Sequence, residues 1–378
     1  MIWILLFVFI FYGIIILSFA IKTTYAGTFD NRTTAHENGF TVIVPFRNET
    51  KNLPRLLTSL AAIDYPSHNW ELILVNDEST DNSLEVINQC LTNNPISNVS
   101  IINNVRTTAS PKKDALQTAI NKAQHNWIVT TDADCYVPTQ WLATLDATIQ
   151  QEQPLMVIMP VAIATTARPS FLTAYEQLDF LSLMGATAGS FYFGLPFLCN
   201  GANLAYEKEA FKAVQGFANN DHIASGDDHF LLEKFQERFK DKISYLRSQD
   251  AIVTTQPQEL WNIFIAQRTR WAAKSSAYTF WFSKLMGLLV VSVNLMSGIG
   301  LIYLAFAKAE TQSLIIIALL LKIIADGILI TTEAQFYKKL SYLKWYPIVM
   351  ICYPFLSTYI AIKSITSSYQ WKGRDYTK

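Results

Sequence analysis

The chain lacks an excess of charge of either sign, and it has few residues that form disulfides or hold zinc. Its 378 residues include 30 lysines and arginines against 30 aspartates and glutamates, so the formal net charge is zero. A chain without a basic excess has no electrostatic footprint for nucleic acid. The four cysteines have no C-x-x-C spacing, and the five histidines form no pair typical of a metal site. This composition argues against zinc and fits a reducing compartment.

Hydrophobic residues are more abundant than a soluble protein of this size requires, at 51% with a mean hydropathy of +0.19. The excess lies at the two ends of the chain, while the middle has ordinary globular composition. The first 20 residues carry no charge, which is about the length needed to cross a bilayer. Further apolar segments follow near 285–307, 313–331 and 345–362. We therefore divide the chain into a transmembrane anchor (1–21), a linker (22–39), a globular domain (40–257), an interfacial helix (258–280) and a C-terminal membrane region (281–378).

The orientation in the membrane follows from the basic residues beside these segments. A cleaved secretory signal is the alternative for the first segment, because Ser18-Phe-Ala20 resembles a cleavage site, but no basic region precedes the long apolar run. Lys22 and Arg32 follow the anchor, which predicts a cytosolic central domain. Two later crossings bring a basic loop at 338–344 back to the same side. The last segment contains two prolines, so it either spans the membrane or is re-entrant or interfacial.

Strand-like and helix-like segments alternate through the first half of the globular domain. Runs rich in β-branched and apolar residues predict strands at 40–45, 71–75, 98–103, 126–131 and 155–162. Helices are predicted at 52–63, after Ser79 or Thr80, and at 110–122. Residues 171–189 are predicted to form an amphipathic helix or a membrane-hugging segment. This alternation predicts an α/β fold with a mostly parallel sheet covered on both faces.

Two carboxylates end one of the predicted strands. The run from Trp127 to Asp134 closes on Asp132 and Asp134, one residue apart. Ligands of open α/β sheets bind outside the carboxyl ends of strands, so this pair should face a crevice. There the two acids could hold a hard divalent cation that also binds a diphosphate. The alternative is a solvated Asp-x-Asp turn, which is common.

Two predicted helix starts carry further signals. Ser110 and Pro111 suit a helix N-terminus, yet Lys112 follows in the first turn, where the helix dipole disfavours a cation. It is either an ordinary surface lysine or part of a phosphate site. The acids Asp227 and Asp228 begin another helix, which by itself is ordinary capping chemistry.

In their order along the chain these pieces resemble the membrane-bound glycosyltransferase family 2 enzymes, which include cellulose, hyaluronan and poly-N-acetylglucosamine synthases and ceramide glucosyltransferases. The resemblance covers about residues 40–275. Its motifs are Val44-Pro-Phe-Arg-Asn-Glu49, Asp77 within Val-Asn-Asp-Glu-Ser, Lys112 with Ala115-Leu116, Asp132-Ala-Asp134, Gly201-Ala-Asn203, Gly226-Asp-Asp228 and Gln267-Arg-Thr-Arg-Trp271. The family implies a GT-A fold, a nucleotide-sugar donor, Mg²⁺ or Mn²⁺, and inversion at the anomeric carbon.

The same resemblance assigns roles to individual residues. Asp77 would recognise the uracil, with Glu49 near the nucleoside and Lys112 near a phosphate. Asp134 would be the direct metal ligand, and Asp132 would lie beside both the metal and the donor. Asp228 would be the general base, because it is the last acid of its motif. Asp227 would lie on the acceptor side. Gln267, Arg270 and Trp271 would hold the diphosphate and line the acceptor site. The chain departs from the family at Glu78, where glycine is usual, and at Asn76, which replaces a frequent aspartate.

We therefore expect a metal-dependent, inverting hexosyltransferase that moves a sugar from a UDP-sugar to a lipid-like acceptor at the cytosolic face of a membrane. The alternatives are a processive polysaccharide synthase with the same chemistry and a catalytically silent membrane scaffold. Few membrane segments favour single transfer over polymer extrusion, since a channel for a polar chain needs helices to enclose it. Lys322 and Asp326 lie four residues apart in one apolar segment. They either neutralise each other or line a cavity for an acceptor headgroup.

Overall fold

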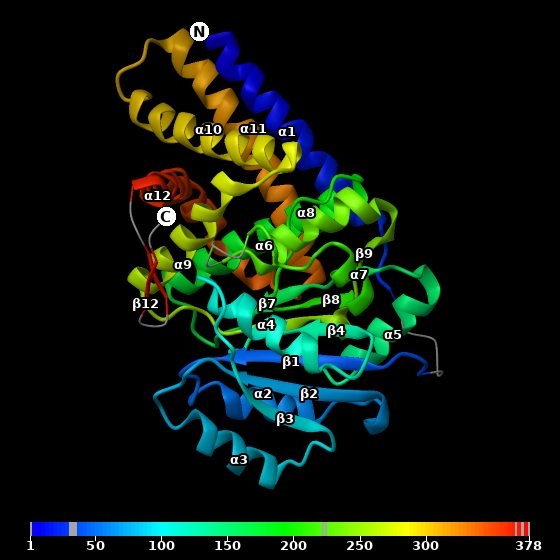
Figure 1. Cartoon of the computed structure of the whole chain (residues 1–378). Coiled ribbons are helices and arrows are strands. Elements are labelled where there is room, and N and C mark those ends of the chain that lie inside the picture. The colour runs from blue at the N-terminus through cyan, green and yellow to red at the C-terminus, as the bar shows by residue number, and fades with distance from the viewer. Residues whose placement is uncertain are drawn as a thin grey trace.

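The computed structural model describes residues 2–29, 36–220, 223, 225–366, 369–371 and 374–376. Figure 1 shows a globular α/β domain below and a group of long helices above. Arg32, one of the two basic residues that predict the orientation of the anchor, lies outside the described residues.

A seven-stranded sheet forms the centre of the globular domain, in the order β3-β2-β1-β4-β8-β6-β9. Four of its six strand pairings are parallel and the two made by β8 are antiparallel, which confirms the mostly parallel GT-A sheet. In sheet order, the strands are β3 (Val99–Asn103), β2 (Trp70–Asn76), β1 (Phe40–Phe46), β4 (Trp127–Thr130), β8 (Leu204–Glu207), β6 (Met156–Ile158) and β9 (Ile243–Tyr245). A second sheet, β5-β10-β7, joins β5 (Cys135–Tyr136), β10 (Val253–Thr255) and β7 (Val161–Ile163).

Helices cover the central sheet, and several of them contain residues of the sequence motifs. They are α2 (Leu53–Ala61), α3 (Ser83–Asn93), α4 (Pro111–Lys122), α5 (Trp141–Glu152), α6 (Phe171–Tyr192), α7 (Lys208–Ala213), α8 (Asp227–Phe239) and α9 (Trp261–Ala273). Short 3₁₀ helices lie at Ser67–Asn69, Lys240–Lys242, Gln249–Ala251, Lys274–Ala277 and Leu340–Trp345. Strands β1, β2 and β4 are almost entirely buried, because helices pack on both faces of this part of the sheet.

Within the described part of the chain, four helices are long and apolar enough to cross a membrane: α1 (Ile2–Tyr25), α10 (Trp281–Tyr303), α11 (Ala309–Phe336) and α12 (Tyr346–Thr366). Helices α1 and α11 pack side by side, with α6 of the globular domain beneath them. Helix α12 is seen almost end-on in Figure 1, so its axis runs across theirs. That orientation is the one expected of an interfacial helix, and the assignment of α12 stays a prediction. Residues 369–371 and 374–376 form a small hairpin, β11 (Tyr369–Trp371) and β12 (Arg374–Tyr376).

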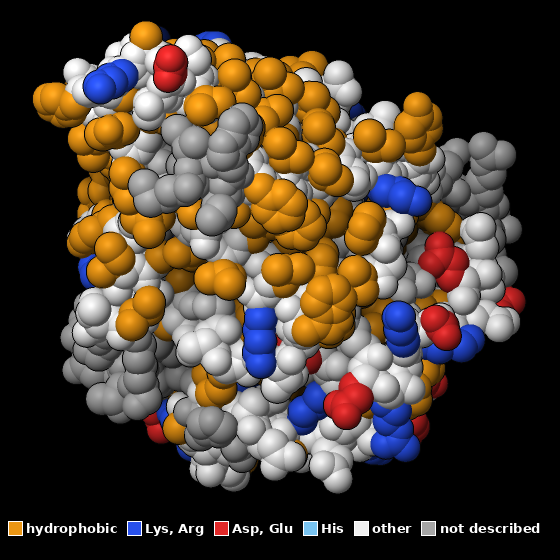
Figure 2. All heavy atoms as spheres, turned by 90° about the horizontal axis from the view of Figure 1, so that it is seen from above, with side chains coloured by type: hydrophobic (Ala, Val, Ile, Leu, Met, Phe, Trp, Pro, Cys, Tyr) orange, Lys and Arg blue, Asp and Glu red, His pale blue; other side chains and the backbone are white. Residues whose placement is uncertain are grey.

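The outer surface of the long helices is apolar. Seen from above, hydrophobic side chains gather over much of the face in Figure 2. The exposed members include Phe7, Ile14, Leu288, Ile302, Ile316 and Ile351. Such a continuous apolar surface marks contact with lipid or protein rather than with water.

The structure corrects five local predictions. Strand β1 continues through Pro45 to Phe46, because its ladder with β4 ends at Ile43 and the missing N–H of proline is not needed there. Helix α3 begins at Ser83, since Ser79 and Thr80 instead bond to Asn48. Segment 155–162 is two strands in different sheets, β6 and β7.

The remaining two corrections concern helix α6 and the start of α4. Helix α6 is neither a surface amphipathic helix nor a membrane-hugging segment: it is buried on most sides between the sheet and the long helices. Ser110 makes no side-chain cap bond. Asp114 instead accepts the N–H groups of Thr107 and Thr108 in the loop before α4.

Candidate active site

One cavity of about 880 Å³ begins at the carboxyl ends of β1, β2 and β4 and continues among the long helices. All of the site residues predicted from the sequence line this cavity: Glu49, Asp77, Lys112, Asp132, Asp134, Asp227, Asp228, Gln267, Arg270 and Trp271. They come from segments more than 200 residues apart in the chain, and parallel strands bring them together because their carboxyl ends meet at one edge of the sheet.

Asp77 follows β2 at this edge and is almost fully buried. Its carboxylate accepts a hydrogen bond from Asn104 Nδ2 at 2.7 Å. The guanidinium of Arg47 donates to the backbone oxygens of Asp77 and Glu78, both at 2.7 Å, and thereby fixes the turn. Glu78 has a φ of +56°, the left-handed region that favours glycine. Glu78 therefore occupies a backbone conformation that glycine adopts more readily.

Asp132 and Asp134 lie in a turn directly after β4, closed by a hydrogen bond from the N–H of Cys135 to the carbonyl of Asp132 at 3.1 Å. Both side chains are partly exposed to the cavity. Among the described residues, no group of three or more His, Cys, Asp or Glu side chains could hold a metal ion. A pair of carboxylates is nevertheless the protein contribution typical of Mg²⁺, whose other ligands are phosphates and water. The donor set therefore fits a divalent ion bound together with a diphosphate.

Lys112 connects the two acidic motifs. Its Nζ lies 2.8 Å from Asp132 Oδ1 and 3.2 Å from Asp227 Oδ2. Burial by itself would lower the pKa of Lys112, but the two carboxylates outweigh it and hold the pKa above its usual value. Lys112 is thus a charged cavity residue and not an ordinary surface lysine. Gly201 lies against this pair: a Cβ there would come 2.9 Å from Asp227 Oδ2, so a larger residue would displace that carboxylate.

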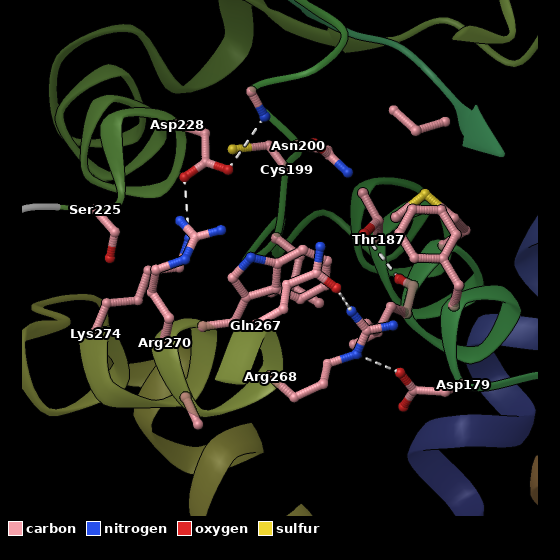
Figure 3. A pocket seen from close by; sticks show the side chains of 18 of the residues that line it. Asp179, Thr187, Cys199, Asn200, Ser225, Asp228, Gln267, Arg268, Arg270 and Lys274 are labelled. Carbon is pink, nitrogen blue, oxygen red and sulfur yellow. Dashed lines mark hydrogen bonds and ion pairs between the residues drawn. The ribbon is translucent and has the colours of Figure 1, made fainter. Parts of the chain in front are cut away.

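Asp228 occupies the first turn of α8, which begins after Gly226 with a φ of +85°. Its Oδ1 accepts hydrogen bonds from the N–H of His229 at 2.7 Å and from Lys274 Nζ at 3.1 Å. Its Oδ2 accepts the N–H of Gly201 at 3.1 Å. Figure 3 shows Asp228 on the side of the pocket that faces Lys274. Burial alone would raise the pKa of Asp228, but Lys274 and Lys112 hold it below the usual carboxyl range. The group is therefore ionised at neutral pH and able to accept a proton.

Glu233 ties the helix that carries Asp228 to the start of α10. Its carboxylate accepts the N–H groups of Thr279 and Phe280, at 3.0 and 2.9 Å, and lies 3.3 Å from His229 Nε2. Burial would raise the pKa of Glu233, but these hydrogen bonds lower it to about 2. Helices α8 and α10 are therefore held together by a charged, fully bonded link.

Helix α9 forms the opposite wall with Gln267, Arg270 and Trp271. Between them, Arg268 donates from Nε to Asp179 Oδ2 at 2.7 Å and from Nη1 to Gln267 Oε1 at 2.7 Å (Figure 3). Its guanidinium also stacks over the ring of Trp271, 4.3 Å from the centroid. Arg268 Nη2 is buried and has no hydrogen-bond partner among the described residues. Arg268 thus positions both Gln267 and Trp271.

Sequence reasoning missed three residues of this site: Asp179, Arg268 and Lys274. A lone aspartate within an apolar helix was a usable signal for Asp179, because a buried charge needs a partner. Arg268 lies inside the Gln267–Trp271 motif, but the resemblance assigns it no role. Lys274 carried no signal, since a lysine after an interfacial helix is ordinary.

The far end of the cavity lies among the long helices. There Asp326 lines the wall, accepts a hydrogen bond from the hydroxyl of Tyr12 at 2.6 Å, and pairs with Lys322 Nζ at 2.6 Å. Lys322 and Asp326 therefore pair with each other, and Asp326 also lines the cavity, so each of the two alternatives for these residues is met in part. The anchor helix adds Tyr12, a partner that the sequence did not indicate.

Comparisons with known proteins agree with this architecture. Residues 41–214 match the family model described as Glycosyl transferase family 2. The chain is 32% identical over 111 residues to the undecaprenyl-phosphate 4-deoxy-4-formamido-L-arabinose transferase of Photorhabdus laumondii, covering 29% of this chain and 33% of that protein. It is 29% identical over 112 residues to the poly(ribitol-phosphate) beta-N-acetylglucosaminyltransferase TarS of Staphylococcus aureus, covering 30% of this chain and 19% of that protein. The matches thus span only a fifth to a third of the length of these relatives.

One solved structure resembles almost the whole chain. It is the mannosyltransferase PcManGT from Pyrobaculum calidifontis in complex with GDP-Man and Mn²⁺, with a TM-score of 0.58 and 17% identity. The match covers 96% of this chain and 99% of that one. At this identity the likeness supports the shared fold.

Proposed function

We propose, from the membership of residues 41–214 in glycosyl transferase family 2, that this chain transfers a hexose from a UDP-sugar to a lipid-like acceptor in the membrane, with inversion at the anomeric carbon. The observation that carries the acceptor assignment is the continuity of the cavity. Its wall includes Asp77, Asp132 and Asp228 at one end, and Tyr12, Asn294 and Asp326 of the long helices at the other. A soluble acceptor would not need a path into the membrane helices.

In the proposed mechanism, Asp228 accepts the proton of the acceptor hydroxyl as that oxygen attacks the anomeric carbon. Its ionised state and its hydrogen bonds to Gly201 and His229 suit a fixed general base. A single base is sufficient for an inverting displacement, because no covalent enzyme intermediate has to be resolved. Lys274 keeps the base ionised and holds its orientation.

The donor lies in the other half of the cavity in this proposal. Asp77 contacts the uracil, Glu49 lies near the nucleoside, and Lys112 and Arg270 face the diphosphate. Asp134 and Asp132 would hold Mg²⁺ or Mn²⁺, which supplies electrostatic stabilisation of the leaving diphosphate. Arginine binds phosphate oxygens in a bidentate manner, which suits Arg270 for the same charge. Gln267 and Trp271, positioned by Arg268, line the junction between donor and acceptor.

The globular domain is proposed to lie in the cytosol. Helices α1 and α11 run parallel to each other in Figure 1, so the C-terminal ends of both lie beside the globular domain. Lys22 ends α1, and Lys338, Lys339 and Lys344 follow α11, which is the positive-inside pattern. A cysteine engineered at Lys344 should stay unlabelled by an impermeant reagent in intact cells. Labelling there would place the domain on the outer side.

The test of the function is a product assay with the purified full chain in lipid nanodiscs. Radiolabelled UDP-sugars are supplied with Mg²⁺ or Mn²⁺, and the lipid extract and the insoluble fraction are analysed separately. A discrete organic-soluble glycolipid supports the proposal. A ladder reaching tens of sugars indicates the processive synthase instead, and the absence of turnover with every donor indicates a silent scaffold.

A further inference from the structure

The membrane part of the cavity has a polar wall that the proposed mechanism does not use. Ser283 and Asn294 of α10 line the cavity and are 3% and 1% exposed. Ser283 Oγ and Asn294 Oδ1 have no hydrogen-bond partner among the described residues. The amide nitrogen of Asn294, by contrast, donates to the carbonyl of Val290 at 2.8 Å, which fixes the side chain.

Unsatisfied polar groups are costly inside a membrane helix, because no water is present to compensate them. The two residues are eleven positions apart, which is close to three full turns, so they lie on one face of α10 about 16 Å apart along its axis. Both open atoms can accept hydrogen bonds, and Ser283 can donate one as well. They therefore suit a ligand whose hydroxyl, amide or ester groups are spread over a comparable length.

The cavity also reaches the lipid-facing surface between α10 and α12. Gly287, Leu288 and Val291 line it and are all exposed, Leu288 by 68% and Val291 by 41%. A Cβ added at Gly287 would meet no atom within 4 Å, so the space beside this turn is open. Half-buried Ser357 and Ala361 of α12 form the opposite side of the opening.

The charged side chains along this wall also indicate the charge of the ligand. Two charged side chains line the membrane part of the cavity, as far as the structure describes it: Lys284, which is exposed at the start of α10, and Asp326. Lys322 and Tyr12 already bind Asp326. A phosphate beside Asn294 and Asp326 would therefore meet a carboxylate whose lysine is already paired, which is unfavourable in a low dielectric.

We infer that Ser283 and Asn294 bind the polar head and linkage region of the acceptor lipid, which enters sideways between α10 and α12. The acceptor is then a neutral glycolipid, with hydroxyls on its sugar and an ester or amide linkage to its chains. It is not an isoprenoid phosphate, whose chain has no polar group beyond the phosphate. This inference rests on the proposed transfer to lipid and specifies the class of lipid.

Two variants with a matched control test the inference. Asn294→Leu and Ser283→Ala remove the hydrogen-bonding groups, and Ser297→Ala is the control, because Ser297 is also buried and unpartnered on α10 but lies outside the cavity wall. Each protein is assayed in nanodiscs with monoglucosyl dioleoylglycerol, glucosylceramide and undecaprenyl phosphate. Thermal unfolding verifies that all variants are folded.

We expect the wild type to glycosylate at least one of the two glycolipids. Asn294→Leu and Ser283→Ala should each raise the KM for that lipid about tenfold, the loss of one hydrogen bond in a buried site. The KM for the sugar donor and the slow rate at which its sugar is transferred to water should not change. The kinetic constants of Ser297→Ala should match those of the wild type. Gly287→Leu, which fills the opening, should lower kcat/KM for the lipid alone.

Two results would overturn the inference while leaving the proposed function intact. One is a wild type that uses undecaprenyl phosphate and neither glycolipid. The other is a lipid KM for Asn294→Leu that equals that of Ser297→Ala. A wild type that gives no organic-soluble product with any lipid instead refutes the proposed function, and the inference with it.

Discussion

Asp228→Asn should abolish transfer without abolishing donor binding, and the structure predicts how much each property changes. The carboxylate makes three hydrogen bonds: Oδ1 accepts from His229 and Lys274, and Oδ2 accepts from Gly201. An asparagine can keep its oxygen toward His229 and Lys274, but its amide then faces the N–H of Gly201, donor against donor. Losing this one bond in a buried site costs about 1–3 kcal/mol of unfolding free energy.

The loss of transfer rate should be larger than the loss of stability, and the two can be measured separately. Removing a general base lowers the rate by about 10²–10⁴, which corresponds to roughly 3–5 kcal/mol in the barrier. The donor Kd should stay close to that of the wild type, because the base acts on the acceptor hydroxyl. The assays are single-turnover transfer, calorimetric titration with a UDP-sugar, and denaturant unfolding.

Asp146→Asn provides the matched control. Asp146 is fully buried on α5, accepts hydrogen bonds from the backbone N–H groups of Glu37 and Asn38, and lies outside the cavity wall. It should lose a similar amount of stability and keep its activity. The reasoning is wrong if Asp228→Asn retains more than a tenth of the transfer rate, or if its donor affinity falls as steeply as the rate.

Three further predictions follow from the geometry of the site. Lys274→Met should move the acid limb of the kcat/KM profile to higher pH. Lys274 lowers the pKa of Asp228, and without it burial raises that pKa. Asp228 would then be protonated at a higher pH, and the activity lost earlier as the pH falls. An unchanged limb would show that another group titrates, and Lys274→Arg should restore the profile. Chelation with excess EDTA should stop turnover, and added Mg²⁺ or Mn²⁺ should restore it. The Asp134→Ala variant should stay inactive when the metal is added back. Full activity in EDTA would contradict the metal role. Glu78→Gly should raise the unfolding free energy by about 0.5–1 kcal/mol, because relief of a φ of +56° should outweigh the loss of an exposed side chain that lies 3.7 Å from Arg47. A decrease in the free energy measured by denaturant unfolding would refute this.

The sequence by itself determined the fold class and the main site residues. Alternation of short apolar runs and helical segments is enough to predict a parallel sheet, because buried strands and their crossover helices have distinct periodicities. The carboxyl ends of such strands share one edge, so Asp77, Asp132 and Asp134 could be expected together before any coordinates. The apolar segments were equally evident, since a bilayer imposes both length and composition.

Only the tertiary structure decided which charges meet. Lys112 could have been a surface lysine, but it contacts both Asp132, 20 positions later in the chain, and Asp227, 115 positions later. Lys274 and Asp179 carried weak signals or none, yet one sets the ionisation of Asp228 and the other holds Arg268. Such pairings depend on the approach of distant helices within a few ångströms, which no local pattern encodes.

The course of the cavity was likewise a tertiary result. Periodicity predicted α10 and α12 as apolar helices, but a membrane helix is apolar on all sides, so its sequence does not indicate which face meets a neighbour and which faces a cavity. The packing of α10 turns Ser283 and Asn294 inward, and the crossing of α12 leaves the space beside Gly287 open. The physical reason is that packing, and not hydrophobicity, sets the relative rotation of helices in a membrane.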